Sequence, residues 1–200
     1  MPYETMPPYE ILLERGDCHA SLGDLPAAQS CYEKAASLGP DEAGPYVGLG
    51  VVALQKNQLD DAEIAFRVAC RLDATCAKAH AGLAIVAQRR QDFQRAFHLY
   101  MKSLELDSDN LTSLLGLFQT SCQMGSFEKV IHYLQVYLEM HPGDTSVMFA
   151  LATLYHKDGR IERAKEMLSS LLTIEPANQD AANLLEEVEH RLAGAQEGRL

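Results

Sequence analysis

The sequence predicts an all-α fold, a solenoid built from stacked helix pairs, and three observations support this prediction. Written from Tyr9 in rows of 34 residues, the chain aligns with itself five times without a gap. Each row holds two stretches with apolar residues at helical spacing. The break between the two stretches holds residues suited to a turn. The rows are 9–42, 43–76, 77–110, 111–144 and 145–178.

The helical spacing is clearest in the second row. Tyr46, Leu49, Gly50 and Ala53 stand at positions i, i+3, i+4 and i+7, so they share one face of a helix. A break follows at residues 56–58. The apolar face of a second helix then consists of Leu59, Ala62, Phe66, Ala69 and Cys70. The row therefore predicts two amphipathic helices joined by a short turn.

Residue size is also repeated from row to row. Small residues recur at the eighth and twentieth places, where they allow two helix axes to approach closely. A large apolar residue fills the twenty-fourth place in every row: Tyr32, Phe66, Tyr100, Leu134 and Leu168. The fourth row departs most, because Phe118, Val130 and Tyr137 stand where helices touch. Either neighbouring small residues compensate, or the larger side chains push the helices apart and kink the superhelix.

Two further columns predict where the helices end and begin. One column inside the rows favours left-handed backbone and holds Gly23, Asn57, Gly125 and Gly159, with Gln91 as the exception. Between rows we expect helix-capping side chains at Asp41, Thr75, Asp109, Asp144 and Asn178.

The two ends of the chain are expected to differ from the repeats. Residues 1–8 are expected to form a leader. Residues 179–193 are expected to form a capping helix that covers the last apolar face, because a solenoid needs a polar outer surface at its end. Its inner stripe is Ala182, Leu185, Val188 and Leu192. Residues 194–200 are expected to be a flexible tail.

Composition and charge exclude several classes of protein. Apolar residues make up 47% of the chain, which is typical of a folded protein. The formal net charge of −11, with no basic run, disfavours binding to nucleic acid. No stretch is long enough for direct insertion into a membrane. Five scattered cysteines do not form a disulfide framework, so we expect a reducing, cytoplasmic location.

The sequence contains no motif of a catalytic site or a metal site. The histidines and cysteines lack the spacing of zinc ligands. Gly-x-Ser-x-Gly and the phosphate-binding Gly-rich motif are both absent from the sequence. Gly48-Leu49-Gly50 lies inside a predicted helix and is interpreted as a packing motif. We therefore expect no enzyme activity, no cofactor and no metal.

The thirty-second place holds Pro40, Pro142 and Pro176 in three of the five rows. The repeated columns resemble those of the tetratricopeptide repeat family, which shares the 34-residue period and the small, large and Pro positions. The resemblance covers residues 9–178. It implies a right-handed superhelical solenoid of antiparallel helix pairs with an extra capping helix. It also implies a non-catalytic scaffold that binds a protein or peptide in a concave groove, lined by the first helix of each repeat.

The family's groove positions, transferred to this chain, give an apolar floor with amide and basic groups near the rim. The partner-binding candidates are Leu13, Val47, Val51, Leu54, Lys78, Ile85, Arg89, Leu115, Gln119 and Phe149. Such a floor favours a hydrophobic peptide or an amphipathic helix. The alternative is that a short superhelix closes on itself and buries these residues. The family's clamp for acidic chaperone tails is not expected, because only Lys78 matches it.

The function predicted from the sequence is therefore a protein–protein interaction scaffold. Two alternatives remain open. The first is a self-assembling structural protein, in which the acidic first repeat meets the more basic middle to form a homo-oligomer. The second is a regulatory arm excised from a larger enzyme.

Overall fold

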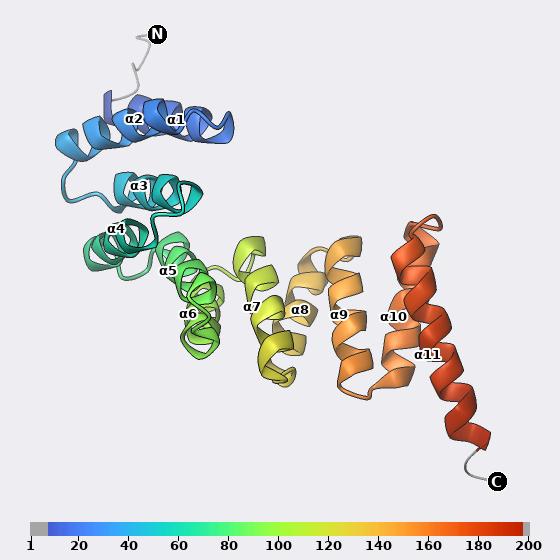
Figure 1. Cartoon of the computed structure of the whole chain (residues 1–200). Helices are drawn as coiled ribbons and strands as arrows, with labels where there is room; N and C mark the ends of the chain where they lie inside the picture. Colours follow the sequence, from blue (N-terminus) through green and yellow to red (C-terminus); the bar gives the residue numbers. More distant parts are fainter. Residues whose placement is uncertain (1–7, 198–200) are drawn as a thin grey trace. The chain divides into compact units, whose positions relative to one another are not determined.

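The computed structural model describes residues 8–197, and all the regular structure among them is α-helical (Figure 1). In chain order the helices are α1 (Pro8–Ser21), α2 (Leu25–Leu38), α3 (Ala43–Gln55), α4 (Leu59–Leu72), α5 (Ala77–Arg89), α6 (Phe93–Leu106), α7 (Leu111–Met124), α8 (Glu128–Met140), α9 (Thr145–Lys157), α10 (Ile161–Ile174) and α11 (Gln179–Glu197). This confirms the predicted all-α solenoid. The expectations for residues 1–7 and 198–200 lie outside the described residues.

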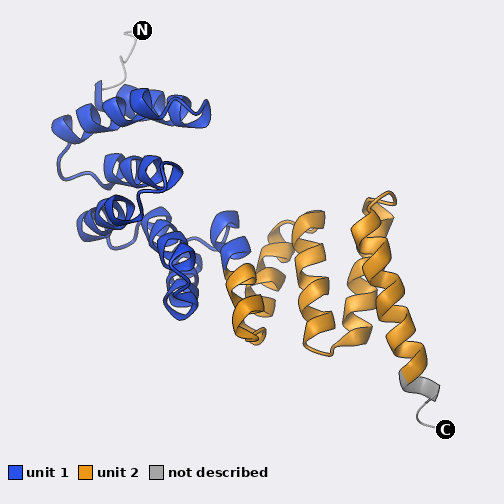
Figure 2. Cartoon of the chain, viewed as in Figure 1, with its two compact units in different colours: residues 1–116 blue, residues 117–200 orange. Residues whose placement is uncertain are grey.

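The chain divides into two compact units, coloured separately in Figure 2. Unit 1 comprises residues 1–116 and unit 2 comprises residues 117–200. The division falls within α7, the first helix of the fourth repeat, which also carries Phe118. Each unit has its own set of buried side chains.

Unit 1 is packed around aromatic rings that lie between glycines. The ring of Tyr32 on α2 lies so close to Gly16 and Gly48 that a Cβ atom at either glycine would collide with it. Phe66 on α4 has the same relation to Gly50 and Gly82. Because glycine has no side chain, a first helix approaches the ring more closely than alanine would allow. The rings of Tyr32 and Phe66 are almost completely buried.

A buried carboxylate also links the second and third repeats of unit 1. The Glu63 side chain on α4 forms ion pairs with Arg67, Arg90 and Arg95, and Arg90 also reaches Asp60. Burial alone raises the pKa of Glu63, but the hydrogen bonds from Arg95 and Arg90 and the charge of Arg67 outweigh burial and lower that pKa. Glu63 therefore stays ionised in its buried position.

Unit 2 uses aliphatic residues where unit 1 uses aromatic ones. Leu134 on α8 and Leu168 on α10 are fully buried at the twenty-fourth place. At the twenty-seventh place unit 2 has the large buried residues Tyr137 and Leu171, where unit 1 has Ala35, Ala69 and Ser103. Val130 and Tyr137, two of the unusual residues of the fourth repeat, are thus part of the core of unit 2.

Helix α11 ends unit 2 and packs against α10. Ala181 and Val188 are completely buried on its inner face, while Glu186, Glu187 and Glu189 are exposed. The helix continues to Glu197, beyond the predicted end at residue 193. Ala195, Gln196 and Glu197 are good helix formers, and the cost of Gly194, about 1 kcal/mol, does not terminate the helix.

The capping predictions are correct for two helices and wrong for three. Asp144 accepts a hydrogen bond from the Val147 amide, and Asn178 accepts one from the Ala181 amide. Asp41, Thr75 and Asp109 do not cap, because each lies one place too early in its row. The residues directly before α3, α5 and α7 are Glu42, Cys76 and Asn110, and of these Asn110 accepts a hydrogen bond from the Ser113 amide.

The left-handed column is confirmed at Gly23, Asn57, Gly125 and Gly159, all of which have positive φ. Gln91, the exception by residue type, also has a φ of 63°. The turn geometry of the repeat therefore imposes this conformation even where the side chain disfavours it.

Candidate functional site

Two adjoining hollows lie along the first helices of unit 1, and we call them together the unit 1 groove. Their volumes are about 540 and about 360 Å³. Val47, Val51 and Lys78 line both hollows, so the two are continuous. The remaining lining residues are Leu13, Asp17, Ala20, Ser21, Tyr32, Gly44, Gly48, Leu54, Gln55, Phe66, Cys76, Ala81, Gly82, Ile85, Asn110 and Thr112.

The floor of the groove follows from the helical period of α3. Val47 and Val51 are four residues apart, so they project from one face of this helix. They pack partly against the core and remain half-exposed, as does Ile85 on α5. Tyr32 and Phe66 come from second helices and reach the groove beside Gly48 and Gly82. Because these glycines have no side chains, the nearly buried rings pack directly beneath the floor of the groove.

Two charged side chains stand in this apolar lining. The Asp17 carboxylate accepts a hydrogen bond of 2.6 Å from the Tyr32 hydroxyl. Burial raises the pKa of Tyr32, and the hydrogen bond to the Asp17 carboxylate raises it further. Lys78 is exposed in the first turn of α5. Among the described residues, Lys78 has neither an ion-pair nor a hydrogen-bond partner.

The structure places most of the residues predicted for unit 1 in this groove. Leu13, Val47, Val51, Lys78 and Ile85 line it with at least part of their side chains exposed. Leu54 also lines it, but only 7% of this residue is exposed because it packs in the core beside Phe66.

Four predicted residues lie elsewhere. Arg89 does not line the groove, because its Nη1 donates a hydrogen bond of 2.7 Å to the carbonyl oxygen of Leu54 and so satisfies the end of α3. Leu115 is 36% exposed on α7 and lines neither hollow. Gln119 and Phe149 belong to unit 2, where Gln119 is exposed and Phe149 is half-buried.

The sequence does not predict two lining residues at the start of α7, Asn110 directly before the helix and Thr112 in its first turn. Tyr32 and Phe66 border the groove, but they are only 2% and 1% exposed and belong to the core beneath its floor. The glycine at the sixth place of the following row, Gly48 or Gly82, marks where each ring packs against a first helix. No repeated pattern marks Asn110 or Thr112.

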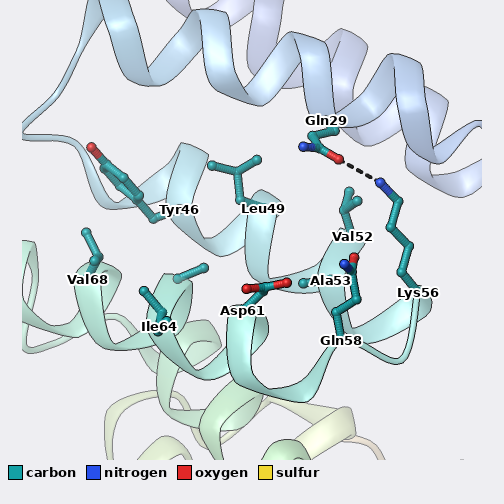
Figure 3. Close-up of a pocket in the computed structure, with 11 residues that line it drawn as sticks. Gln29, Tyr46, Leu49, Val52, Ala53, Lys56, Gln58, Asp61, Ile64 and Val68 are labelled. Atoms are coloured by element: carbon teal, nitrogen blue, oxygen red, sulfur yellow. Dashed lines mark hydrogen bonds between the residues drawn. The ribbon is translucent and has the colours of Figure 1, made fainter.

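A further hollow, of about 420 Å³, lies on the opposite face of α3, between α2 and α4 (Figure 3). Lys56 donates a hydrogen bond of 2.6 Å to Gln29 at its edge, and Figure 3 marks this bond with a dashed line. Leu49 and Val68 line it, and Ile64 is 61% exposed beside it. This second hollow offers an internal comparison for the groove, because it presents apolar residues on another face of the same unit.

The described residues contain neither a cluster of metal-binding side chains nor a helix suited to crossing a membrane. Within residues 8–197, no three His, Cys, Asp or Glu side chains gather closely enough to hold a metal ion. None of the helices in that range combines the length and the apolar character needed to cross a membrane.

Comparisons with known proteins agree with this architecture. Two family models, both described as tetratricopeptide repeat, match residues 13–75 and 123–188, which together are more than half of the chain. No curated protein sequence matches the chain.

Several solved structures are similar in fold. PilF of Pseudomonas aeruginosa has a TM-score of 0.76 at 18% identity, covering 96% of this chain and 89% of that chain. MamA has a TM-score of 0.66 at 20% identity, covering 84% and 92% of the two chains. YrrB, described as a TPR protein with an unusual peptide-binding site, has a TM-score of 0.66 at 20% identity, covering 86% and 89%. With its 34-residue helix pairs and both family matches, the chain belongs to the tetratricopeptide repeat family.

Proposed function

We propose that the protein is a non-catalytic interaction scaffold that binds a peptide or an amphipathic helix of a partner protein in the unit 1 groove. The observation that carries this proposal is the continuity of the two hollows along α1, α3 and α5, with Val47 and Val51 in the floor of both. Tetratricopeptide repeat proteins in general are non-catalytic scaffolds that bind protein or peptide partners.

The chemistry of the lining supports an apolar ligand face. Leu13, Val47, Val51 and Ile85 offer half-exposed aliphatic surface, and the buried Phe66 ring supports this floor from below. Removing this surface from water on binding favours association by roughly 25 cal/mol per Å². An amphipathic helix presents such side chains on one face and leaves its polar face in solvent. The peptide-binding site of YrrB adds support from a protein of the same fold.

The test is affinity capture from native lysate with three proteins: wild type, a Val51→Lys/Ile85→Lys variant and an Ile64→Lys variant. The double variant places two charges in the groove. Ile64→Lys removes a more exposed apolar residue on the second hollow and serves as the matched control. Far-ultraviolet circular dichroism of all three establishes that the helices are retained.

We expect a partner that is retained by wild type and by the Ile64→Lys variant and is lost by the double variant. A partner lost only with Ile64→Lys would transfer the site to the second hollow. Equal retention by all three proteins would contradict binding in either hollow.

A further inference from the structure

We propose that the partner segment bound in the unit 1 groove carries a basic and an acidic side chain on either side of its apolar residues. The basic side chain pairs with Asp17 and the acidic side chain pairs with Lys78. This inference rests on the proposed function and narrows the class of peptide that the groove accepts.

Asp17 is held in place for a cation. Its carboxylate accepts the Tyr32 hydroxyl at 2.6 Å, and the Tyr32 ring cannot easily shift because Gly16 and Gly48 enclose it. Among the described residues, no cationic side chain forms an ion pair with Asp17. A neutral hydroxyl leaves the carboxylate charge uncompensated, and its remaining lone pairs can accept further hydrogen bonds. A Lys or Arg side chain of a ligand supplies both the charge and the donors.

Lys78 occupies a position that the isolated helix does not favour. It lies in the first turn of α5, where the helix dipole favours negative charge, and this turn holds no acidic residue. By contrast, α4 has Asp60 and Asp61 in its first turn. Lys78 also lacks an ion pair with any described residue. A residue that breaks a local preference without compensation within the chain is typical of a functional position.

The two charges belong to one surface. Asp17 and Lys78 line the same hollow, with Val47 and Val51 of the intervening helix α3 between them. A ligand with apolar residues over the two valines and opposite charges at its two sides covers the apolar floor and forms an ion pair with each charged residue. A ligand with two like charges places one of them against a like charge of the groove.

The experiment measures the affinity of three fluorescein-labelled amphipathic peptide helices that share one leucine stripe. The stripe is flanked by Lys and Glu in the first peptide, by Lys at both sides in the second and by Glu at both sides in the third. Fluorescence anisotropy is recorded for each peptide at low and high salt. We expect wild type to prefer the mixed peptide by about threefold or more over each of the others, and this preference to shrink in high salt.

Charge-swapped variants make the test specific. Lys78→Glu should turn the preference toward the peptide with two Lys, and Asp17→Lys should turn it toward the peptide with two Glu. Asp17→Asn, whose side-chain oxygen still accepts the Tyr32 hydroxyl, should abolish the preference for a basic flank without reversing it. Glu14→Lys, an exposed α1 residue that lines neither hollow, is the control and should leave the order unchanged.

The outcomes separate this inference from the proposed function. Equal affinities of the three peptides for wild type, with all three weakened by Val51→Lys/Ile85→Lys, would overturn the charge selection and leave groove binding intact. The same shift in order with Glu14→Lys as with Asp17→Lys would also overturn it, because only overall charge would then matter. Failure of all three peptides to bind, or binding unaffected by Val51→Lys/Ile85→Lys, would overturn both.

Discussion

At the same places of the repeat, the two units place large and small side chains differently. In unit 1 the second helix contributes an aromatic ring, Tyr32 or Phe66, and the first helices on either side contribute glycines. In unit 2 the second helix contributes Leu134 or Leu168 at that place. The large buried residue at the twenty-seventh place, Tyr137 or Leu171, then fills space that alanine or serine leaves to the ring in unit 1.

This difference indicates that the repeat requires a certain total volume of side chains where helices touch. It does not require one particular residue type at each place. Cores tolerate redistribution of volume between neighbours but not its net addition. It also has a consequence for the surface. In unit 1 the glycines at the sixth place let the buried rings of Tyr32 and Phe66 pack directly beneath the groove. The corresponding residue of the fifth repeat, in unit 2, is Ala150, which carries a Cβ atom.

The units also differ in electrostatics. Unit 1 has the buried Glu63 carboxylate surrounded by three guanidinium groups. In unit 2, the pair between Lys165 and Glu189 links α10 to α11 at 2.7 Å, but both side chains are about half-exposed. Exposed pairs contribute at most about 1 kcal/mol, so we expect charge to matter more for the stability of unit 1.

The largest effect is expected from Gly48→Ala, which tests the volume argument directly. A Cβ atom at this position collides with the Tyr32 ring, which Gly16 confines from the other side. We expect a loss of about 2–3 kcal/mol in the free energy of unfolding, despite the gain in helix propensity. Urea denaturation followed by circular dichroism measures it, and amide hydrogen exchange locates the loss in unit 1.

Two further variants sharpen that result. Tyr32→Leu introduces the residue type that unit 2 uses, so the double variant Gly48→Ala/Tyr32→Leu should be more stable than Gly48→Ala alone. Gly194→Ala is the matched control, because a Cβ atom there meets no neighbour within 4 Å. A loss with Gly48→Ala no greater than the effect of Gly194→Ala would contradict the packing described for unit 1.

The next effect in size is expected from Glu63→Gln, which removes the charge on which three arginines converge. Because the guanidinium groups are partly exposed, we expect a loss of about 2 kcal/mol, below the range for fully buried pairs. The folded-state pKa of Glu63 is lowered, so its stabilisation is present above its unfolded pKa and disappears as the pH falls through the lowered value.

Unfolding free energies of wild type and Glu63→Gln measured across acidic pH test this dependence. The two curves should be separated near neutral pH and converge in acid. A separation that does not change with pH would mean that the carboxylate charge of Glu63 does not cause the stabilisation.

A smaller loss, about 1–2 kcal/mol, is expected from Leu134→Phe, the reverse exchange in unit 2. By the register of unit 1, residue 134 should face Ala150, where a ring has too little space. Adding Ala150→Gly should recover part of the loss, as measured by the same denaturation experiment. An unchanged stability of Leu134→Phe would show that unit 2 is more loosely packed than unit 1 at this place.

The smallest effect is expected from Gln91→Gly, which should stabilise the protein by about 0.5–1 kcal/mol. Gln91 adopts a φ of 63° in a turn of unit 1, and glycine adopts this conformation without a steric penalty. Gly159→Ala, at the same place in unit 2, should be destabilising by a similar amount. Thermal unfolding of both variants provides the comparison, and the same sign of change in both would refute the backbone explanation.

Most of the fold was predictable because its signals are local. The first helices begin at Ala43, Ala77, Leu111 and Thr145, the residues at which the 34-residue rows begin. Five of the residues that the family resemblance placed in a partner-binding groove line the unit 1 groove and are at least partly exposed, and their binding role stays a prediction. Three of the five cap positions were missed by one place, since capping depends on the exact first residue of a helix.

The sequence by itself therefore determined the period, the helices and the apolar face of α3. Only the tertiary structure decided that Leu54 belongs mainly to the core, that Arg89 is bound to the Leu54 carbonyl, and that the chain divides within α7. It also brought Asp17 and Lys78, residues of two different repeats, to one hollow. The physical reason is that spacing along a helix depends on the local backbone, whereas a hollow depends on how closely three helices approach. That approach is set by the volumes of side chains such as Tyr32 that lie between them.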